Sequence, residues 1–525
     1  MIKQYCEIDP VMGTQLGIAG DHDGRLPPVE SGTVNALLDA LARECRQSIE
    51  RSLPGDPDDS IDFELAASGI RRMQILNEAL RPHERNPDWY LETAMSALHS
   101  LLTRSDLGMD EKAFRIAQRL AAIPAHLHAG RSQIRRPPSV LVETAAGNVG
   151  GAIEFCRDLA AFIESVPSRA AQIEIEHHCG ACLEALVEFS DFIASRQAIA
   201  VDDFAVGEAA FNQLLSAGFV PHDSRALSDV GVAAAGRIER DLRECSLRYA
   251  GHADWPLVLG ALEAQHPAQE ALLEDYREMV EDCRRFVEQR ELVDVPPAAL
   301  EIVPTPMFAR ANLAFAAYIP APPFAGGGTA RFWVTPASGN ALALHHPGRM
   351  VVAAVHETYP GHHVQFSHAL RVRRPLRHLF GSTVFIEGWG LYSEELMMSA
   401  GFKGEDSRFE LLRMSLLRDQ LWRALRIVID VGLHCGAMSS AEAVDLLVDR
   451  HVLDRASARA EVLFYCSAPT QPMSYMVGKL LIEALVEKCR ASGEERFQSL
   501  PGIHNELLAH GALPVPLLER ALRIA

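Results

Sequence analysis

A chain of 525 residues that is 48% hydrophobic and 23% charged has the composition of an ordinary folded protein, which excludes a disordered one. Its 50 lysines and arginines are outnumbered by 69 aspartates and glutamates, and the formal charge of −19 disfavours non-specific binding to nucleic acid or anionic membranes. Short peptides or small molecules are therefore the expected ligands. The composition leaves the oligomeric state open.

The start of the chain and its cysteines predict the compartment. The first ten residues, MIKQYCEIDP, contain two acids and no apolar run, and about 18 consecutive apolar residues occur nowhere. The ten cysteines are scattered, without the dense spacing of a disulfide scaffold. We expect a cytoplasmic protein with reduced thiols and no membrane span.

Amphipathic helices dominate residues 1–295. Apolar side chains recur every three or four residues in VNALLDALARECRQSIERS near residue 34, DWYLETAMSALHSLLTRS near 88, AIEFCRDLAAFIESV near 152 and QEALLEDYREMVEDCRRFVEQR near 269. Breaks rich in proline and glycine separate these runs. We predict that residues 1–295 form an N-terminal helical lobe.

One run inside this lobe, EIEHHCGAC, is a rival candidate for a metal site. Its possible ligands are His177, His178, Cys179 and Cys182. No second pair of ligands follows at zinc-finger spacing, and the run continues a longer helical pattern. We interpret it as a packed helix.

The composition changes at residues 296–349, where proline and glycine surround one β-like run, ARFWVT, at 330–335. The glycines at 326–328 form either the hinge of a flap over a cleft or part of a surface linker. The run itself forms either an edge strand that pairs with an extended peptide or a structural hairpin. Residues 296–525 are predicted to form a second helical lobe, which completes one catalytic unit with the first.

The segment AAVHETYPGHHVQF at 353–366 begins like a zinc-binding helix and is then interrupted. His356 and Glu357 are adjacent, as in the HExxH motif, but Pro360 stands where the second histidine is expected. Proline lacks the N–H that continues a helix, and its ring clashes with the carbonyl four residues earlier. We therefore expect a kink between residues 359 and 361.

The kink decides whether a second histidine reaches the ion bound by His356. On an unbroken helix His363 would share a face with His356 but would lie about 10 Å further along the axis. Only a local break folds a second imidazole back to within about 2 Å of a shared ion. We favour His362 as the ligand and keep His363 as the alternative.

A third ligand is expected from the next helical run, VFIEGWGLYSEEL. Glu387 follows His362 by 25 residues, and Glu394 lies seven residues later on the same helical face. Two carboxylates on one face suggest a metal ligand and a partner that hydrogen-bonds a ligand histidine. For each residue alone the alternative is a packed, hydrogen-bonded side chain.

The run RDQLWRALRIVIDVGLHCG carries a polar stripe on an apolar helix. Its members share one face, at intervals of three, four and four residues: Arg423, Arg426, Asp430 and His434. Such a stripe is either a buried salt-bridge network or a wet cleft wall. In a cleft, Arg426 would contact substrate, and His434 would contact substrate or donate to an oxyanion.

In APTQPMSYMVGKLL, Tyr475 and Lys479 fall four residues apart on one helical face after a proline-bounded turn. Peptide hydrolysis needs a hydrogen-bond donor for the oxyanion, a role open to Tyr475. Lys479 either neutralises the terminal carboxylate of a substrate or is an ordinary solvated lysine.

Four motifs, HETYPGHH, EGWGLYSE, YCSAPTQPMSYMVGKL and HGALPVPLLERAL, resemble the bacterial domain-of-unknown-function 885 family over most of the chain. That family is similar to gluzincin peptidases of the angiotensin-converting-enzyme and thimet-oligopeptidase type. The resemblance implies a mainly α, two-lobed fold around a deep cleft. One zinc ion would be held by His356, His362 or His363, and Glu387.

The same resemblance implies Glu357 as general base and Tyr475 as the tyrosine that stabilises the transition state. This chain departs from the gluzincins in two respects. The HExxH motif is interrupted, and Leu391 stands four residues after the ligand glutamate, where the relatives often have an acid.

These features predict a zinc-dependent hydrolase, a peptidase that acts on short peptides. One alternative is a metal-dependent hydrolase of a non-peptide amide or ester, which would share the ligands and differ in the cleft walls. The other is a binding protein that keeps the fold without the metal.

Overall fold

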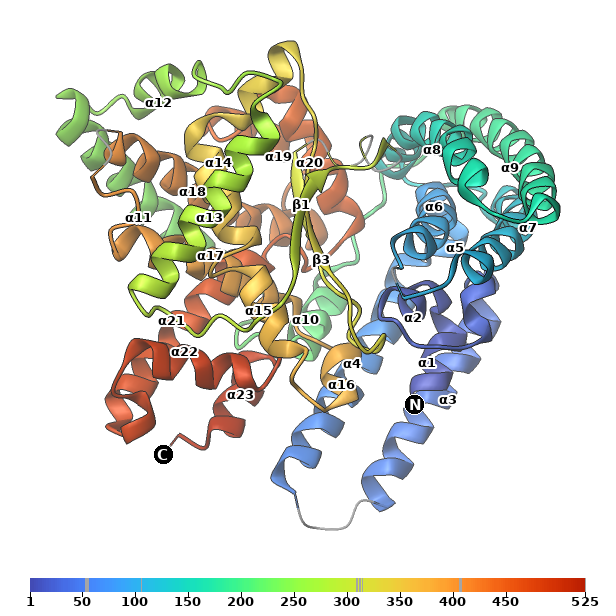
Figure 1. Ribbon diagram of the computed structural model, residues 1–525, viewed down its shortest axis with the longest axis horizontal. Coiled ribbons are helices and arrows are strands. Elements are labelled where there is room, and N and C mark those ends of the chain that lie inside the picture. Colours follow the sequence, from blue (N-terminus) through green and yellow to red (C-terminus); the bar gives the residue numbers. More distant parts are fainter. Residues whose placement is uncertain are drawn as a thin grey trace.

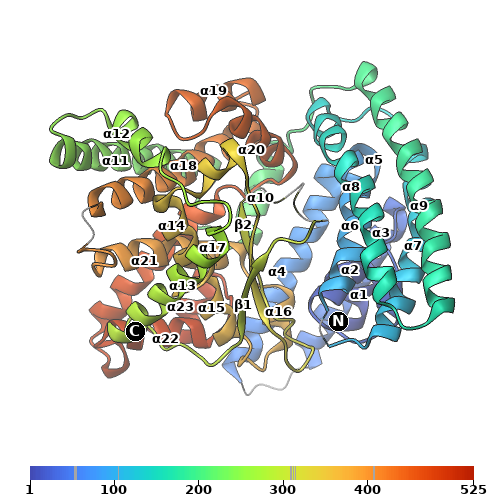
Figure 2. The same ribbon diagram turned by 45° about the horizontal axis from the view of Figure 1, so that its top comes forward.

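The computed structural model describes residues 1–51, 56–104, 106–307, 310, 313, 315–405 and 408–524. The chain is mainly helical with one small sheet, as the sequence predicts (Figure 1). The sheet lies between a group of helices α6–α9 and a larger group that contains α11–α23 (Figures 1 and 2).

The first part of the chain forms nine helices and one short 3₁₀ segment in its described residues. Their bounds are α1 (Ile2–Ile8), α2 (Pro10–Gln15), η1 (Asp21–Gly24), α3 (Ser31–Arg51), α4 (Pro57–Leu80), α5 (Pro82–Arg85), α6 (Pro87–Thr103), α7 (Met109–Gln133), α8 (Ser139–Ser165) and α9 (Arg169–Arg196). Side chains cap several of them: Asp56 accepts from the N–H of Asp58, and a proline at the first helical position follows the cap.

The interpretation of EIEHHCGAC as a packed helix is confirmed by α9. Cys179 and Cys182 are buried in the core shared by α6–α9, and the sulfur of Cys182 lies 3.6 Å from that of Cys156 on α8. His177 is exposed on the opposite side. The two cysteines face the core and His177 faces solvent, so the four possible ligands do not gather around one point.

Helices continue through the rest of the chain. Those before the sheet are η2 (Gln197–Ile199), α10 (Glu208–Ala217), α11 (Ser224–Ala250), α12 (Trp255–Glu263) and α13 (Leu272–Gln289). Those after it are η4 (Gly339–His345), α14 (Pro347–Glu357), α15 (His362–Ala369), α16 (Pro375–Leu379), α17 (Thr383–Ser399), α18 (Phe409–His434), α19 (Ser440–Asp449), α20 (Arg455–Ser467), α21 (Ser474–Ser492), η5 (Glu495–Phe497), α22 (Leu500–Ala509) and α23 (Val515–Leu522).

Two of the three hydrophobic cores join residues from both sides of position 295. In the first, Leu41 and Tyr276 share a core with Trp389. In the second, α11 packs along α18, and the approach is closest at Gly231, where a Cβ atom would lie 2.9 Å from the side chain of Ile427. Helix α18, which carries the polar stripe, is thereby held from both parts of the chain.

The sheet corrects one prediction. The run ARFWVT forms β3 (Ala330–Val334), which is the central strand and not an edge strand. It pairs in parallel with β1 (Leu300–Pro304) and antiparallel with β2 (Ala316–Ile319). Successive side chains of a strand point to opposite faces, so Phe332 packs on α13 and Trp333 packs on α6.

Strand β2, which the sequence did not indicate, is one of the two edge strands; the other is β1. Strand β2 lies beside α14, and the connection from β2 to β3 contains the three consecutive glycines, with φ values of 72°, 156° and 158° for Gly326, Gly327 and Gly328. These values lie in the region that glycine tolerates best. The flap at these glycines stays a prediction.

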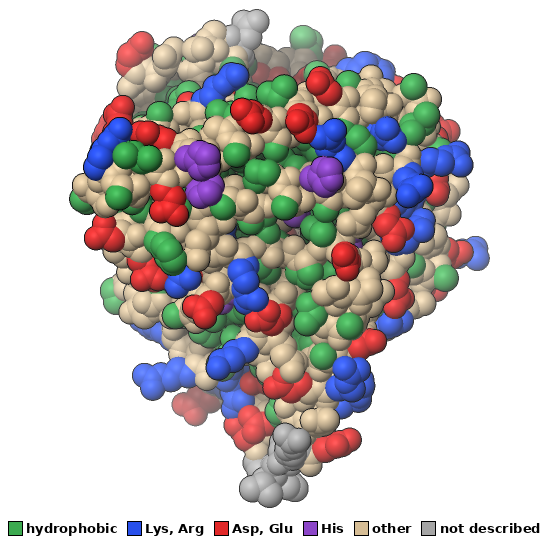
Figure 3. All heavy atoms as spheres, turned by 90° about the vertical axis from the view of Figure 1, so that its right-hand side faces the viewer, with side chains coloured by type: hydrophobic (Ala, Val, Ile, Leu, Met, Phe, Trp, Pro, Cys, Tyr) green, Lys and Arg blue, Asp and Glu red, His purple; other side chains and the backbone are tan. Residues whose placement is uncertain are grey.

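The surface of the α6–α9 group is mixed in character. Acidic and basic side chains are interspersed over it, with apolar side chains between them (Figure 3). Within the described residues, no helix combines the length and apolar composition needed to span a bilayer.

Candidate metal centre

The predicted interruption of the HExxH helix is confirmed. Helix α14 ends at Glu357, and α15 begins at His362 after a turn that contains a cis Tyr359–Pro360 bond. Gly361 is required by space, because a Cβ atom there would lie 1.9 Å from the carbonyl oxygen of His356. The indole N–H of Trp389 on α17 donates to the carbonyl of Pro360 at 2.9 Å and fixes the turn against the next helix.

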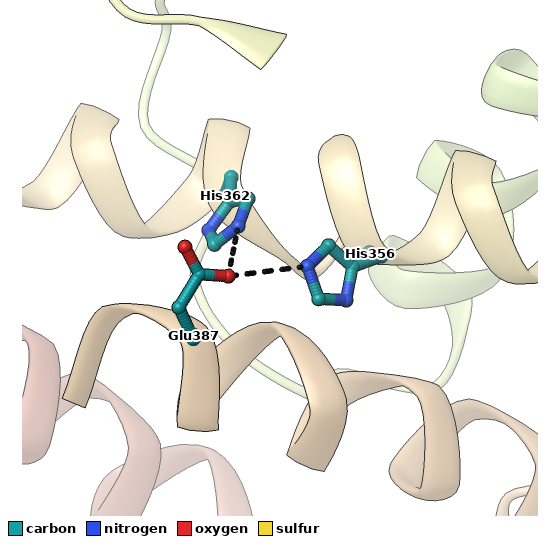
Figure 4. A group of neighbouring side chains, drawn as sticks. All are labelled: His356, His362 and Glu387. Atoms are coloured by element: carbon teal, nitrogen blue, oxygen red, sulfur yellow. Dashed lines mark ion pairs between the residues drawn. The ribbon is translucent and has the colours of Figure 1, made fainter. Parts of the chain in front are cut away.

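The break brings three possible metal ligands together. His356 at the end of α14 and His362 at the start of α15 point toward Glu387, which projects from α17 (Figure 4). The Nε2 atom of each histidine lies 3.7 Å from Oε2 of Glu387, and all three ligand atoms lie within 4.8 Å of one another. Among the described residues this is the only group of three or more His, Cys, Asp or Glu with such spacing.

These separations fit a single small cation. Three ligands about 2.0–2.1 Å from a tetrahedral zinc ion lie about 3.3 Å apart, so small movements would close the cluster around one ion. Two imidazoles and one carboxylate are the ligand set of one class of catalytic zinc sites, which keeps a fourth position open. The donor atoms therefore suit zinc.

The structure brings His362 into the cluster and turns His363 away. The Nδ1 atom of His363 lies 3.3 Å from the hydroxyl of Tyr318, and its ring packs edge-on against Tyr359. Burial lowers the pKa of His363 to about 4, so its neutral ring serves as packing. Of the two histidines that the sequence left open, only His362 faces Glu387.

Each histidine of the cluster is oriented through its other ring nitrogen. Nδ1 of His356 donates to Oε1 of Glu394 at 2.7 Å, as the seven-residue spacing from Glu387 predicts. Nδ1 of His362 donates to Oε1 of Gln365 at 3.2 Å. With Nδ1 of each ring engaged in this way, Nε2 is the nitrogen that faces the cluster and would bind a metal ion.

The electrostatics of the cluster favour a cation. Burial raises the pKa of Glu387, but the contacts with the two histidines outweigh burial and hold this pKa well below its usual range. Burial also opposes a charged His356, yet its contacts with Glu387 and Glu394 raise its pKa to about 10. The anionic carboxylate of Glu387 thus lies beside a protonated His356, and a divalent ion bound there would displace that proton.

Two glycines let α17 approach the site closely. At Gly390 a Cβ atom would lie 2.5 Å from Cε1 of His356, and at Gly388 it would lie 2.4 Å from the backbone of Gly478 on α21. The first contact seats the imidazole against α17. The second brings the start of α21, with Tyr475, to the same side of the cluster.

Replacing Gly390 with alanine is expected to weaken metal binding by about 10–100-fold, the cost typical of losing the support behind a metal ligand. The added methyl group would displace the ring of His356 and disturb its hydrogen bond to Glu394, one turn further along α17. Zinc titration with a competing chelator measures the loss, and circular dichroism checks the fold. Unchanged affinity in a folded variant would contradict this account of Gly390.

A pocket of about 390 Å³ opens onto the cluster. Its lining comes from β2, α14, α15, α17, α18 and α21: Phe315, Ala316, Ala317, Tyr318, Arg349, Val352, Ala353, His356, Glu357, His362, Glu387, Glu394, Asp419, Trp422, Arg423, Arg426 and Tyr475. Glu357 lies next to His356, and its Oε2 accepts from the backbone N–H of Tyr318 at 3.0 Å. Edge strand β2 therefore positions this carboxylate.

Tyr475 lies across the pocket as the sequence predicts. Its ring stacks on that of His356 with centroids 6.3 Å apart, and the guanidinium of Arg426 lies 4.9 Å from its centre on α18. Burial raises the pKa of Tyr475 to about 12, so its hydroxyl keeps its proton at neutral pH and can donate a hydrogen bond.

The polar stripe of α18 is part pocket wall and part buried network, the two alternatives that the sequence left open. Arg423 and Arg426 line the pocket. Asp430 and His434 are fully buried in the helical core. There the carboxylate of Asp430 accepts from backbone N–H groups at 470 and 473, and Nε2 of His434 donates to the carbonyl of Tyr465 at 3.0 Å.

Two predicted site residues are not brought to the pocket. His434 is absent from its lining and bonds the backbone of α20 from within the core, so its position does not suit an oxyanion donor. Lys479 is also absent, and its ammonium group donates to Glu483 at 2.6 Å, one helical turn further on. The helical spacing placed both residues on the correct helix but did not show which neighbour covers them.

The fold and the site define a mainly helical protein in which two histidines of an interrupted helix meet a glutamate of the next long helix beside an open pocket. The chain belongs to the family of bacterial proteins of unknown function called DUF885, whose family model matches residues 10–522.

Two solved structures share this fold. One is described as a "putative lipoprotein of unknown function" from Shewanella oneidensis, with a TM-score of 0.80 and 18% identity over 99% of this chain and 98% of that chain. The other, a similarly described lipoprotein from Colwellia psychrerythraea, has a TM-score of 0.80 and 16% identity over 99% and 97% of the two chains. No curated protein matches the chain.

Proposed function

We propose that the protein is a zinc-dependent hydrolase that cleaves short peptides by activating water. The observation that carries this proposal is the cluster of His356, His362 and Glu387, whose ligand atoms lie within 4.8 Å of one another beside Glu357 in one pocket. A pocket of about 390 Å³ is at the small end of ligand pockets, which suits short substrates.

The residues of the pocket have distinct parts in this reaction. A zinc ion held by the cluster would supply a Lewis acid and lower the pKa of water. Glu357 accepts a proton from the attacking water and passes it to the leaving amine. The hydroxyl of Tyr475 donates to the substrate carbonyl oxygen as that oxygen gains negative charge.

The order of these residues along the chain supports a gluzincin-like reading. As in that class, two histidines flank a glutamate in sequence, and a second glutamate follows on a later helix. Two extra residues separate the histidines of this chain, and the turn at Pro360 and Gly361 compensates by folding His362 back toward His356. The departure at Leu391 has little effect on the site, because Glu394 contacts His356 instead.

We also propose one zinc ion per chain and a cytoplasmic location. All ten cysteines are free, and nine of them are buried, which suits a reducing compartment. The word lipoprotein in the descriptions of the two similar structures applies to those proteins.

The experiment is elemental analysis of the purified chain combined with a screen of short peptides. We expect one zinc ion per chain, hydrolysis of at least some peptides, loss of activity with a chelator and recovery with zinc. Hydrolysis restricted to non-peptide amides or esters would keep the metal chemistry and change the substrate class. A chain that binds no transition metal stoichiometrically would contradict the proposal and favour a binding protein.

A further inference from the structure

Three arginines line the pocket and have no part in the proposed reaction. Arg349 comes from α14, and Arg423 and Arg426 come from α18. Each guanidinium lies over an aromatic ring: Arg349 over Phe315 at 4.5 Å, and Arg423 and Arg426 over Trp422 at 4.6 and 4.3 Å. Stacking holds the flat face of a guanidinium and leaves its N–H edge available for hydrogen bonds.

The three arginines differ in how far their donors are already used. Arg426 donates from Nε to the hydroxyl of Tyr465 at 2.8 Å and from Nη2 to Glu461 at 3.0 Å, so it mainly supports the wall. Nη1 of Arg423 contacts Asp419, whereas its buried Nε has no hydrogen-bond partner. Among the described residues, no carboxylate lies within 4.0 Å of the guanidinium of Arg349.

The four acidic side chains of the pocket already have partners. Glu387 lies against the two histidines, Glu394 accepts from His356, and Glu357 accepts from the Tyr318 backbone. Asp419 lies 3.5 Å from Arg423 and 3.8 Å from Arg418. Arg349 helps to lower the pKa of Asp419 but forms no ion pair with it within 4.0 Å, so its N–H donors remain for an anion from outside the chain.

We propose that Arg349 and Arg423 bind a carboxylate of the substrate. This inference rests on the proposed function where it places the carboxylate relative to a bond that is cleaved at the cluster. Arg349 precedes His356 by seven residues on one face of α14, which is about 10 Å along the helix axis. This is the length of about three extended residues, so the carboxylate belongs to a short substrate.

In a peptide, the bound carboxylate could be either the free C-terminus or an acidic side chain. Guanidinium forks also bind phosphate, but four carboxylates line the same pocket, and a doubly charged group would be repelled more strongly than a carboxylate. The recognised class is therefore a monoanionic carboxylate.

The test is calorimetric binding of three probes to the metal-free protein, which makes the result independent of zinc. The probes are N-acetyl-Ala-Ala, its C-terminal amide, and N-acetyl-Ala-Asp-amide, which carries only a side-chain carboxylate. We expect at least one acid to bind about tenfold or more tightly than the neutral amide, the range for a charge-assisted pair. The better of the two acids identifies the source of the carboxylate.

Substitutions test whether Arg349 and Arg423 cause the preference for an acid over the amide. Arg349→Met leaves no ion-paired carboxylate behind, and we expect it to reduce the preference for the acid to nearly equal binding. Arg423→Met should act in the same direction. Arg423→Lys keeps a positive charge beside Asp419 and shows whether an effect of Arg423→Met reflects the lost charge or a misfolded chain. Arg240→Met, on the exposed side of α11, is the control that should keep the full preference.

Equal binding of acids and amide by the wild-type protein, or a preference that survives both Arg349→Met and Arg423→Met, would overturn the inference. Failure of all three probes to bind would overturn it as well. These outcomes differ from failure of the proposed function, which is read from zinc content and hydrolysis. A protein that binds no zinc but prefers the acids would keep the carboxylate site and lose the hydrolase.

Discussion

Replacing Glu357 with glutamine is expected to lower hydrolysis by roughly 10²–10⁴-fold while zinc stays bound. Glutamine has nearly the same shape as glutamate, and its amide oxygen can still accept from the backbone N–H of Tyr318, which lies 3.0 Å from the native carboxylate. It cannot take a proton from water at neutral pH. The three ligand side chains are untouched, so the metal content should remain at one ion per chain.

The measurements are kcat/KM on the best peptide of the screen and zinc content of the same preparation. Glu184→Gln, on the exposed side of α9, makes the same chemical change far from the pocket and should leave both unchanged. Full activity in Glu357→Gln would remove Glu357 from the mechanism. Loss of zinc together with activity would instead assign Glu357 to the metal site.

The sequence predicted the centre of the site because its information is local. A proline at 360 has to break a helix, and the glycine after it is the only residue that fits beside the carbonyl of His356. The contact of Glu394 with His356 follows from seven-residue spacing on α17, which depends only on helical geometry. Such features need no knowledge of distant packing.

The walls of the pocket depend on packing between elements, which periodicity does not reveal. Nothing in the sequence around β2 indicates that the N–H of Tyr318 faces Glu357, or that β2 lies at an edge of the sheet while β3 lies at its centre. Arg349 was missed although it lies seven residues before His356 on the same face, a spacing that could have indicated it. Gln365, three residues after His362, carried a similar local signal.

The positions of His434 and Lys479 outside the pocket have the same origin. A helical stripe shows which side chains share a face, but α18 is long enough that one face runs from the pocket at Arg423 into the core at His434. Lys479 is buried rather than solvated, and a local signal could have indicated its partner, since Glu483 follows four residues later and pairs with it.

Exchange of the two adjacent histidines for glutamine is expected to separate a metal ligand from a packing residue. His362→Gln should lower zinc content from one ion per chain to a small fraction, because it removes one of the three proposed ligands. His363→Gln should keep the full content, because that ring faces Tyr318 and Tyr359 and not Glu387. The pair changes the same residue type at neighbouring positions, so each variant controls for the other.

Thermal unfolding gives a second readout of the same pair. An ion that binds only the folded chain stabilises it by about 2.7 kcal/mol at a free concentration 100-fold above its Kd. Wild type and His363→Gln should both gain this zinc-dependent rise in Tm, with His363→Gln starting from a lower value because a buried ring is lost. His362→Gln should show almost no rise. If His363→Gln lost the metal and His362→Gln kept it, the turn at Pro360 would have to place the second imidazole in another way, and the site built around Glu387 would be wrong.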